Sequence, residues 1–181
     1  MMKIFTTQLI GHLNRIQDQE EMNIEDSARL LAQALIGEGK LYIYGYKELH
    51  GVVLEAMASS EPLEKAEALL DENGQVKELS QEDRVLLFTY RSTDEEAMSI
   101  AKALSDQGIQ LVGVSALIKN AESGLDSITD LHIDAKLRQP LIPDEDGERY
   151  GFPALMTSLY VFYALSFTIK EILHEYEDEL L

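Results

Sequence analysis

The sequence predicts an α/β protein, a three-layer sandwich in which a parallel β-sheet lies between helices. Short apolar runs rich in Val, Ile, Leu and aromatic residues alternate along the chain with segments of helical periodicity. Because the runs are apolar at successive positions rather than at every second one, both faces of the sheet are expected to be covered. The 181 residues are enough for one domain with a sizeable core.

The first 38 residues are expected to form a pair of helices. Apolar residues recur at helical spacing through residues 3–20 and again through 25–36. Gly37 and Gly39 then favour an end to the second helix. We therefore expect one domain over residues 1–181 that opens with this helical pair.

Residues 40–135 are expected to contain the sheet and its crossover helices. The predicted strands are residues 41–44, 85–89, 110–115 and 131–133, with a further edge strand near 66–70. The predicted helices between them are residues 52–57 and 94–107, followed by a short helical piece before the last strand.

Residues 136–152 are expected to form a long loop, and residues 153–178 a terminal helix. The stretch 150–169 has no charged side chain over about the length needed to cross a bilayer. It contains three tyrosines and a proline, and its flanks show no positive bias to either side. We therefore expect a helix buried by the core and by a second subunit rather than a membrane span.

The charge of the chain limits the kinds of partner. Thirty-three acidic and fifteen basic residues give a net charge of −18, which repels nucleic acid and anionic lipid. The absence of cysteine excludes disulfides and thiolate metal sites. Residues 1–6 show no export signal, so a cytoplasmic location is expected. Neither a cofactor nor a metal ion is expected.

The polar segment after the predicted strand 85–89 is the first candidate site. A helix is expected to begin there, and the unpaired amides of its first turn can hold a phosphate. The Arg91 guanidinium supports an anion site because it can bind phosphate through two N–H groups. Helix capping explains the same segment without a ligand, since Ser92 and Thr93 are each followed three residues later by Glu. The candidate ligand-binding residues of this segment are Thr89, Arg91, Ser92, Thr93 and Asp94.

The loop after the first predicted strand is the second candidate, because it is expected to open on the same edge of the sheet. Its candidate ligand-binding residues are Gly45, Lys47 and His50. A solvated turn is the alternative. His174 follows Glu171 by three residues, a spacing found in metal sites but more often at a plain surface.

The order of these elements resembles that of the sugar isomerase (SIS) domain over essentially the whole chain. The clearest stretch is residues 82–93, where an apolar run ends in a hydroxyl-bearing turn. The resemblance implies a five-stranded parallel sheet of flavodoxin-type order, a homodimer formed through helices, and a phosphosugar held at the turn after the third strand. Among single-domain members the layout is most similar to phosphoheptose isomerases and to uncharacterised bacterial SIS-like proteins.

The sequence departs from the SIS pattern in both loops. Where the family has Ser-x-Ser-Gly-x-Ser/Thr, this chain has Thr-Tyr-Arg-Ser-Thr-Asp, and the Gly-x-Gly-x-Ser pattern of the first loop keeps only Gly45. Three hypotheses follow. The first is binding of a phosphorylated sugar without assured catalysis. The second is an aldose–ketose isomerase with Glu48 or Glu55 as its base and His174 as a further candidate catalytic residue. The third is a dimer without a ligand.

Overall fold

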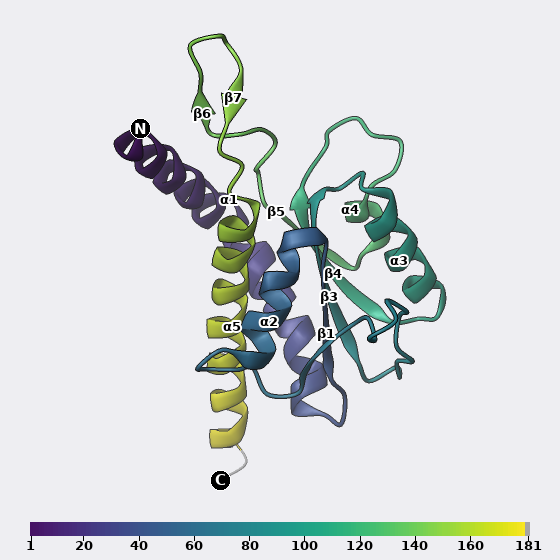
Figure 1. Cartoon of the computed structure of the whole chain (residues 1–181). Coiled ribbons are helices and arrows are strands. Elements are labelled where there is room, and N and C mark those ends of the chain that lie inside the picture. Colours follow the sequence, from purple (N-terminus) through teal and green to yellow (C-terminus); the bar gives the residue numbers. More distant parts are fainter. Residues whose placement is uncertain (180–181) are drawn as a thin grey trace.

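The computed structural model describes residues 1–179. Five parallel strands form the central sheet in the order β2-β1-β3-β4-β5 (Figure 1). These strands are β1 (Leu41–Gly45), β2 (Ala66–Ala68), β3 (Arg84–Arg91), β4 (Gln110–Ala116) and β5 (Leu131–Asp134). The helices are α1 (Met2–Ile36), α2 (His50–Ala58), α3 (Glu95–Asp106), α4 (Leu125–Ile128) and α5 (Ala154–Glu179), and a 3-10 turn spans Lys47–Leu49. The predicted three-layer fold and its strand order are confirmed.

Alternate side chains of each strand enter two separate cores. Leu41 and Ile43 of β1 pack with α1, α2 and α5 on one face of the sheet. Tyr42 and Tyr44 of the same strand pack with α3 and α4 on the other face. This alternation follows from the two-residue repeat of a strand, and it explains why the strands are apolar at consecutive positions.

The N-terminal segment is one continuous helix of 35 residues, so the predicted helical pair is wrong. Neither Gly nor Pro interrupts residues 20–25, and the backbone hydrogen bonds therefore continue through them. The change in apolar pattern reflects a change of neighbour, because α1 packs against both α5 and β5. Its first turns extend beyond the sheet (Figure 1).

The uncharged stretch of the sequence lies mostly in α5, which runs beside α1 and α2 (Figure 1). Phe162, Leu165 and Ile169 are buried in the core, as the apolar stripe predicts. The opposite side leaves Tyr163 and Phe167 exposed. Within residues 1–179, no helix combines the length and the hydropathy that a membrane span requires.

The segment predicted as a loop at 136–152 contains a short antiparallel hairpin, β6 (Ile142–Pro143) and β7 (Arg149–Tyr150). The Arg149 side chain closes its base, because Nε donates to the Pro140 carbonyl at 2.7 Å and Nη2 donates to the Leu141 carbonyl at 2.8 Å. The predicted edge strand near 66–70 is β2, which pairs in parallel with β1.

His12 joins α1 to α5 inside the core. Its Nε2 lies 3.1 Å from Thr157 Oγ1, and the residue is 2% exposed. Burial, with a smaller contribution from the nearby Arg15 charge, lowers the pKa of His12 from 6.5 to about 4. The folded protein therefore keeps this imidazole neutral at pH values where the unfolded chain protonates it.

This difference predicts acid sensitivity. Between pH 6.5 and pH 4 the unfolded state binds the extra proton, so the free energy of unfolding should fall as the pH falls through this window. His12→Gln retains a polar partner for Thr157 but cannot titrate. We expect the wild type to lose up to roughly 3 kcal/mol more than this variant over the window, measured by urea unfolding. Equal losses in the two proteins would contradict the assignment.

Candidate functional site

The loops after β1 and β3 meet at the carboxyl edge of the sheet, as the sequence predicts. The Tyr46 backbone N–H donates to the Phe88 carbonyl at 3.0 Å. The rings of Tyr46 and Tyr90 are in edge-to-face contact with centroids 5.3 Å apart, and the Tyr90 hydroxyl donates to Glu48. Aromatic and carboxylate groups therefore dominate this contact.

The first loop makes a sharp turn that leaves its polar side chains outside. A Cβ at position 45 would lie 2.2 Å from the Leu49 carbonyl oxygen, so Gly45 is needed for the close approach of backbone. Lys47 has a left-handed backbone, with φ of 50°. Lys47 and His50 are both exposed.

We expected the backbone N–H at position 92 to be exposed, and this prediction is wrong. Ser92 is completely buried, and its N–H donates to the Ala116 carbonyl at 3.0 Å. Its hydroxyl accepts from the Ile118 N–H at 3.0 Å, and its carbonyl accepts from the Leu125 N–H at 2.7 Å. Ser92 thus fixes the segments after β4 to the end of β3, and its backbone N–H is not available to a ligand.

The Asp94 carboxylate accepts hydrogen bonds from two donors at the end of β3. Its Oδ2 accepts from Thr89 Oγ1 at 2.6 Å and from the Arg91 N–H at 3.0 Å. A negatively charged side chain of the protein itself therefore occupies two of the donors that we expected to bind a phosphate, and it makes no capping bond to the first turn of α3. The Arg91 side chain is exposed, and Thr93 is half-buried.

The two candidate bases are both hydrogen-bonded to tyrosines. Burial and the hydrogen bond to Glu48 raise the pKa of Tyr90 to about 12, and Glu55 accepts from the Tyr163 hydroxyl. His174 is exposed and lies 20 residues beyond Ala154, about 30 Å along α5 from the end that begins near the candidate loops (Figure 1). Among residues 1–179, no three His, Cys, Asp or Glu side chains gather as a metal site would require.

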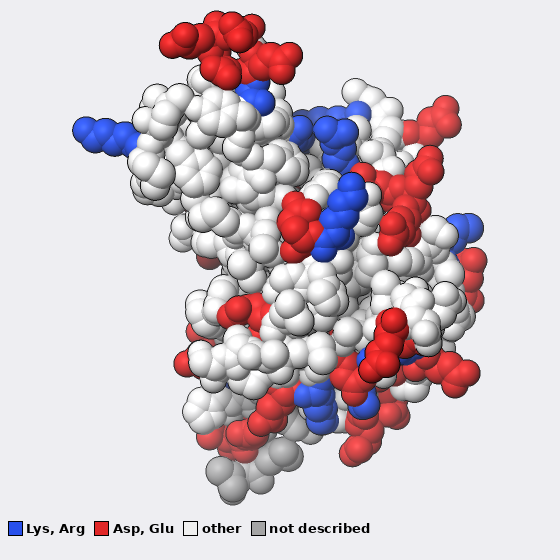
Figure 2. Space-filling view, viewed as in Figure 1, with Lys and Arg blue, Asp and Glu red and all other residues white. Residues whose placement is uncertain are grey.

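A groove rich in basic side chains lies at the same edge, where β4 and β5 end beside α1. It consists of two cavities of about 350 and 370 Å³. Arg15, Lys136 and Arg138 line both cavities, Lys119 lines the first, and Arg149 lines the second. We call this region the cationic groove. In Figure 2, blue atoms lie below the hairpin tip and beside the upper end of the sheet, whereas red atoms are frequent over the rest of that face.

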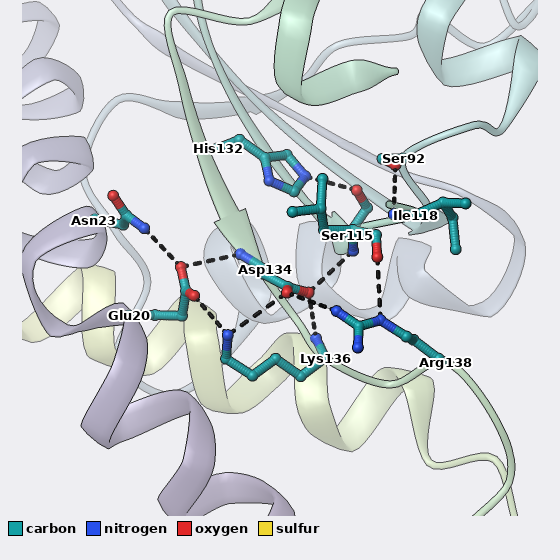
Figure 3. A network of polar contacts seen from close by, with 10 residues as sticks. Glu20, Asn23, Ser92, Ser115, Ile118, His132, Asp134, Lys136 and Arg138 are labelled. Carbon is teal, nitrogen blue, oxygen red and sulfur yellow. Dashed lines mark hydrogen bonds and ion pairs between the residues drawn. The ribbon is translucent and has the colours of Figure 1, made fainter. Parts of the chain in front are cut away.

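A buried ion cluster forms the floor of the groove (Figure 3). Lys136 Nζ lies 2.7 Å from Glu20 Oε1 and 3.5 Å from Asp134 Oδ2, and the three side chains are 7–11% exposed. Asp134 also accepts from the backbone N–H groups of Leu117 at 3.0 Å and Lys136 at 2.8 Å. Lys136 has a left-handed backbone with φ of 57°, a strained conformation for lysine that these contacts hold in place.

A histidine and a serine that contact each other lie beside the ion cluster. Ser115 Oγ is 2.7 Å from His132 Nε2, and Ser115 is completely buried (Figure 3). Burial lowers the pKa of His132, so the ring is neutral at pH 7. The glycine at position 113 makes room for it, since a Cβ there would lie 3.2 Å from the His132 ring.

The cationic groove was not among the sites predicted from the sequence, because its cations come from separate segments. Asp134, Lys136 and Arg138 alternate directly after the predicted strand 131–133, at the edge where ligands bind in parallel sheets. That signal was present in the sequence, whereas the approach of Arg15 from α1 depends on tertiary packing.

The hydrogen bonds of Asp94 at the end of β3 predict that substitutions of Asp94 and of its neighbour Glu95 differ in their effect on stability. Asp94→Ala removes the acceptor for the buried Thr89 hydroxyl and for the Arg91 N–H, so we expect a loss of about 1–3 kcal/mol in the free energy of unfolding. Glu95→Ala removes an exposed acid one residue later and should change stability by about 0.5 kcal/mol or less. Urea unfolding measures both, and similar losses would contradict the structural role of Asp94.

Comparison with known proteins identifies the family. A family model described as a domain of unknown function, DUF2529, matches residues 1–173. The Bacillus subtilis (strain 168) protein named "Uncharacterized protein YwjG" is 52% identical over 176 residues, which cover 97% of this chain and 99% of that protein.

Solved structures of low sequence identity share the fold. A phosphoheptose isomerase from Francisella tularensis has a TM-score of 0.65 at 13% identity, covering 94% of this chain and 96% of that one. The Escherichia coli CFT073 protein c3406, solved in complex with a sugar phosphate, has a TM-score of 0.62 at 16% identity, covering 93% and 89%. The sugar isomerase domain of an RpiR transcription factor from Sphaerobacter thermophilus has a TM-score of 0.58 at 10% identity, covering 98% and 97%. The chain therefore belongs to the DUF2529 family, and its fold is that of sugar isomerase domains.

Proposed function

We propose that the protein binds a small phosphorylated carbohydrate, or a related anionic derivative, in the cationic groove. The main support for this proposal is that five basic side chains line two adjoining cavities in a chain of net charge −18. Such a concentration attracts a small anion locally although the protein as a whole repels anions. The ligand class also agrees with the sugar phosphate bound to the E. coli neighbour.

The first cavity offers both charge and hydrogen-bonding groups. Four basic residues and two acidic ones line it, which leaves a surplus of two positive charges. Gln19 and Asn23 of α1 add amide groups on the same wall, and amides can donate to and accept from sugar hydroxyls. Arg15 has no ion-pair partner among residues 1–179, so its charge is available to a ligand.

In this proposal the loop residues predicted from the sequence lie outside the two cavities. Arg91 pairs with Ala116 across β3 and β4, directly before the Leu117 that lines the groove. Its backbone therefore lies near the β4 side of the groove, although Arg91 lines neither cavity. Lys47 and His50 lie one strand further away, after β1.

Catalysis is not part of the proposal. An aldose–ketose isomerase needs a carboxylate that is free to move a proton next to the sugar. Glu48 and Glu55 are hydrogen-bonded to tyrosines, and Glu20 and Asp134 of the groove are committed to the ion cluster. Binding without turnover therefore fits these contacts better than the isomerase alternative.

We also propose that two copies associate through helices. The outer faces of α2 and α5 expose Leu54, Met57, Tyr163 and Phe167. These apolar side chains belong to two helices that pack together, and a second copy would remove them from water.

Ligand titration tests the binding site. Isothermal titration calorimetry with a panel of sugar phosphates and the matching free sugars should show binding of phosphorylated members alone. Arg15→Gln and Lys119→Gln should each weaken that binding about three- to tenfold, because each removes one charge from the groove.

The control removes a charge elsewhere. Lys102→Gln lies on the exposed side of α3 and should leave affinity unchanged. If Arg91→Gln weakens binding while Arg15→Gln does not, the ligand occupies the β3 loop instead. Absence of binding by the whole panel would favour the dimer without a ligand.

Sedimentation velocity tests the association. The wild type should sediment as a dimer, and Phe167→Glu should yield monomer because it places a charge in the apolar face. Glu122→Gln, in the exposed segment between β4 and α4, serves as the control. A monomeric wild type would overturn this proposal.

A further inference from the structure

We infer that the ligand carries two anionic groups, one for each cavity of the cationic groove, as a sugar bisphosphate does. This inference rests on the proposed function and adds the number of charged groups to it. Its basis is the two-part shape of the groove and the unpaired cations that line each part.

The two cavities are joined by shared basic residues. Arg15, Lys136 and Arg138 line both of them, so these side chains stand between two binding volumes. On α1 the lining residues extend from Gln8 to Asn23, which is about 22 Å along the helix axis. One sugar ring with one phosphate cannot fill a groove of that length.

The second cavity has no acidic residue among its described lining residues. Arg149 joins the three shared cations there, and the other lining residues are neutral at pH 7. The first cavity contains Glu20 and Asp134, which neutralise part of its charge. Lys136 and Arg138 are paired with these acids. Within residues 1–179, the unpaired cations are therefore Arg15 and Lys119 in the first cavity and Arg15 and Arg149 in the second, and each cavity can attract an anionic group.

Arg149 has donors left for such a group. Its Nε and Nη2 donate to the carbonyls of Pro140 and Leu141, which fixes the guanidinium at the base of the hairpin. A guanidinium has five N–H groups, and two bonds leave three of them for another acceptor. A second phosphate would thus meet a cation that is already held in position.

The test compares ligands that differ in one phosphate. Calorimetry at fixed ionic strength would use fructose 6-phosphate with fructose 1,6-bisphosphate, and ribulose 5-phosphate with ribulose 1,5-bisphosphate. We expect at least one bisphosphate to bind about tenfold or more tightly than its monophosphate.

A negative charge introduced into the second cavity tests whether the second anionic group binds there. Gln8→Glu adds an acid to that cavity on an exposed helix position, and it should weaken bisphosphate binding several-fold while leaving monophosphate binding unchanged. Gln75→Glu adds the same charge in an exposed turn and should change neither.

The outcomes separate the two proposals. If no monophosphate or bisphosphate binds, the proposed function fails and the inference fails with it. If each pair binds equally tightly, the inference alone is overturned. A bisphosphate preference that Gln8→Glu reduces no more than Gln75→Glu also overturns it, because the second group then lies outside the second cavity.

Discussion

The buried contact between Glu20 and Lys136 is the interaction on which the carboxyl edge of the sheet depends. Charged groups are costly to remove from water, and removing Lys136 would leave the buried carboxylates of Glu20 and Asp134 without this cation. Glu20 belongs to α1 and Lys136 follows β5, so the pair fixes the long helix against the end of the sheet. Asp134 adds backbone hydrogen bonds to the same cluster. The position of the groove follows from this attachment.

Much of the fold could be predicted from local sequence. Strands such as Val85–Phe88 are apolar at every position, and the helix between β3 and β4 shows clear periodicity, so their order indicated a covered parallel sheet. The single α1 could not be predicted in the same way. Its apolar pattern shifts near Glu20 because its packing partner changes, and a shift of that kind resembles a break between two helices.

The site was less predictable than the fold. The sequence indicated correctly that the loops after β1 and β3 would meet, but it could not show that Ser92 and Asp94 bond to the protein itself. A hydroxyl or carboxylate beside a helix start has the same pattern whether it binds a ligand or closes a turn. The cationic groove required the approach of Arg15 to Lys136, which are 121 residues apart in the chain.

The hairpin between β6 and β7 places a cluster of acids close to a cluster of bases. Asp144, Glu145 and Asp146 occupy its exposed tip, while Arg149 at its base lines the groove. Screening limits each cluster to about one Debye length, roughly 8 Å at physiological ionic strength. The hairpin therefore presents negative charge at its tip and positive charge at its base, so the field that an approaching anion meets changes sign along the hairpin.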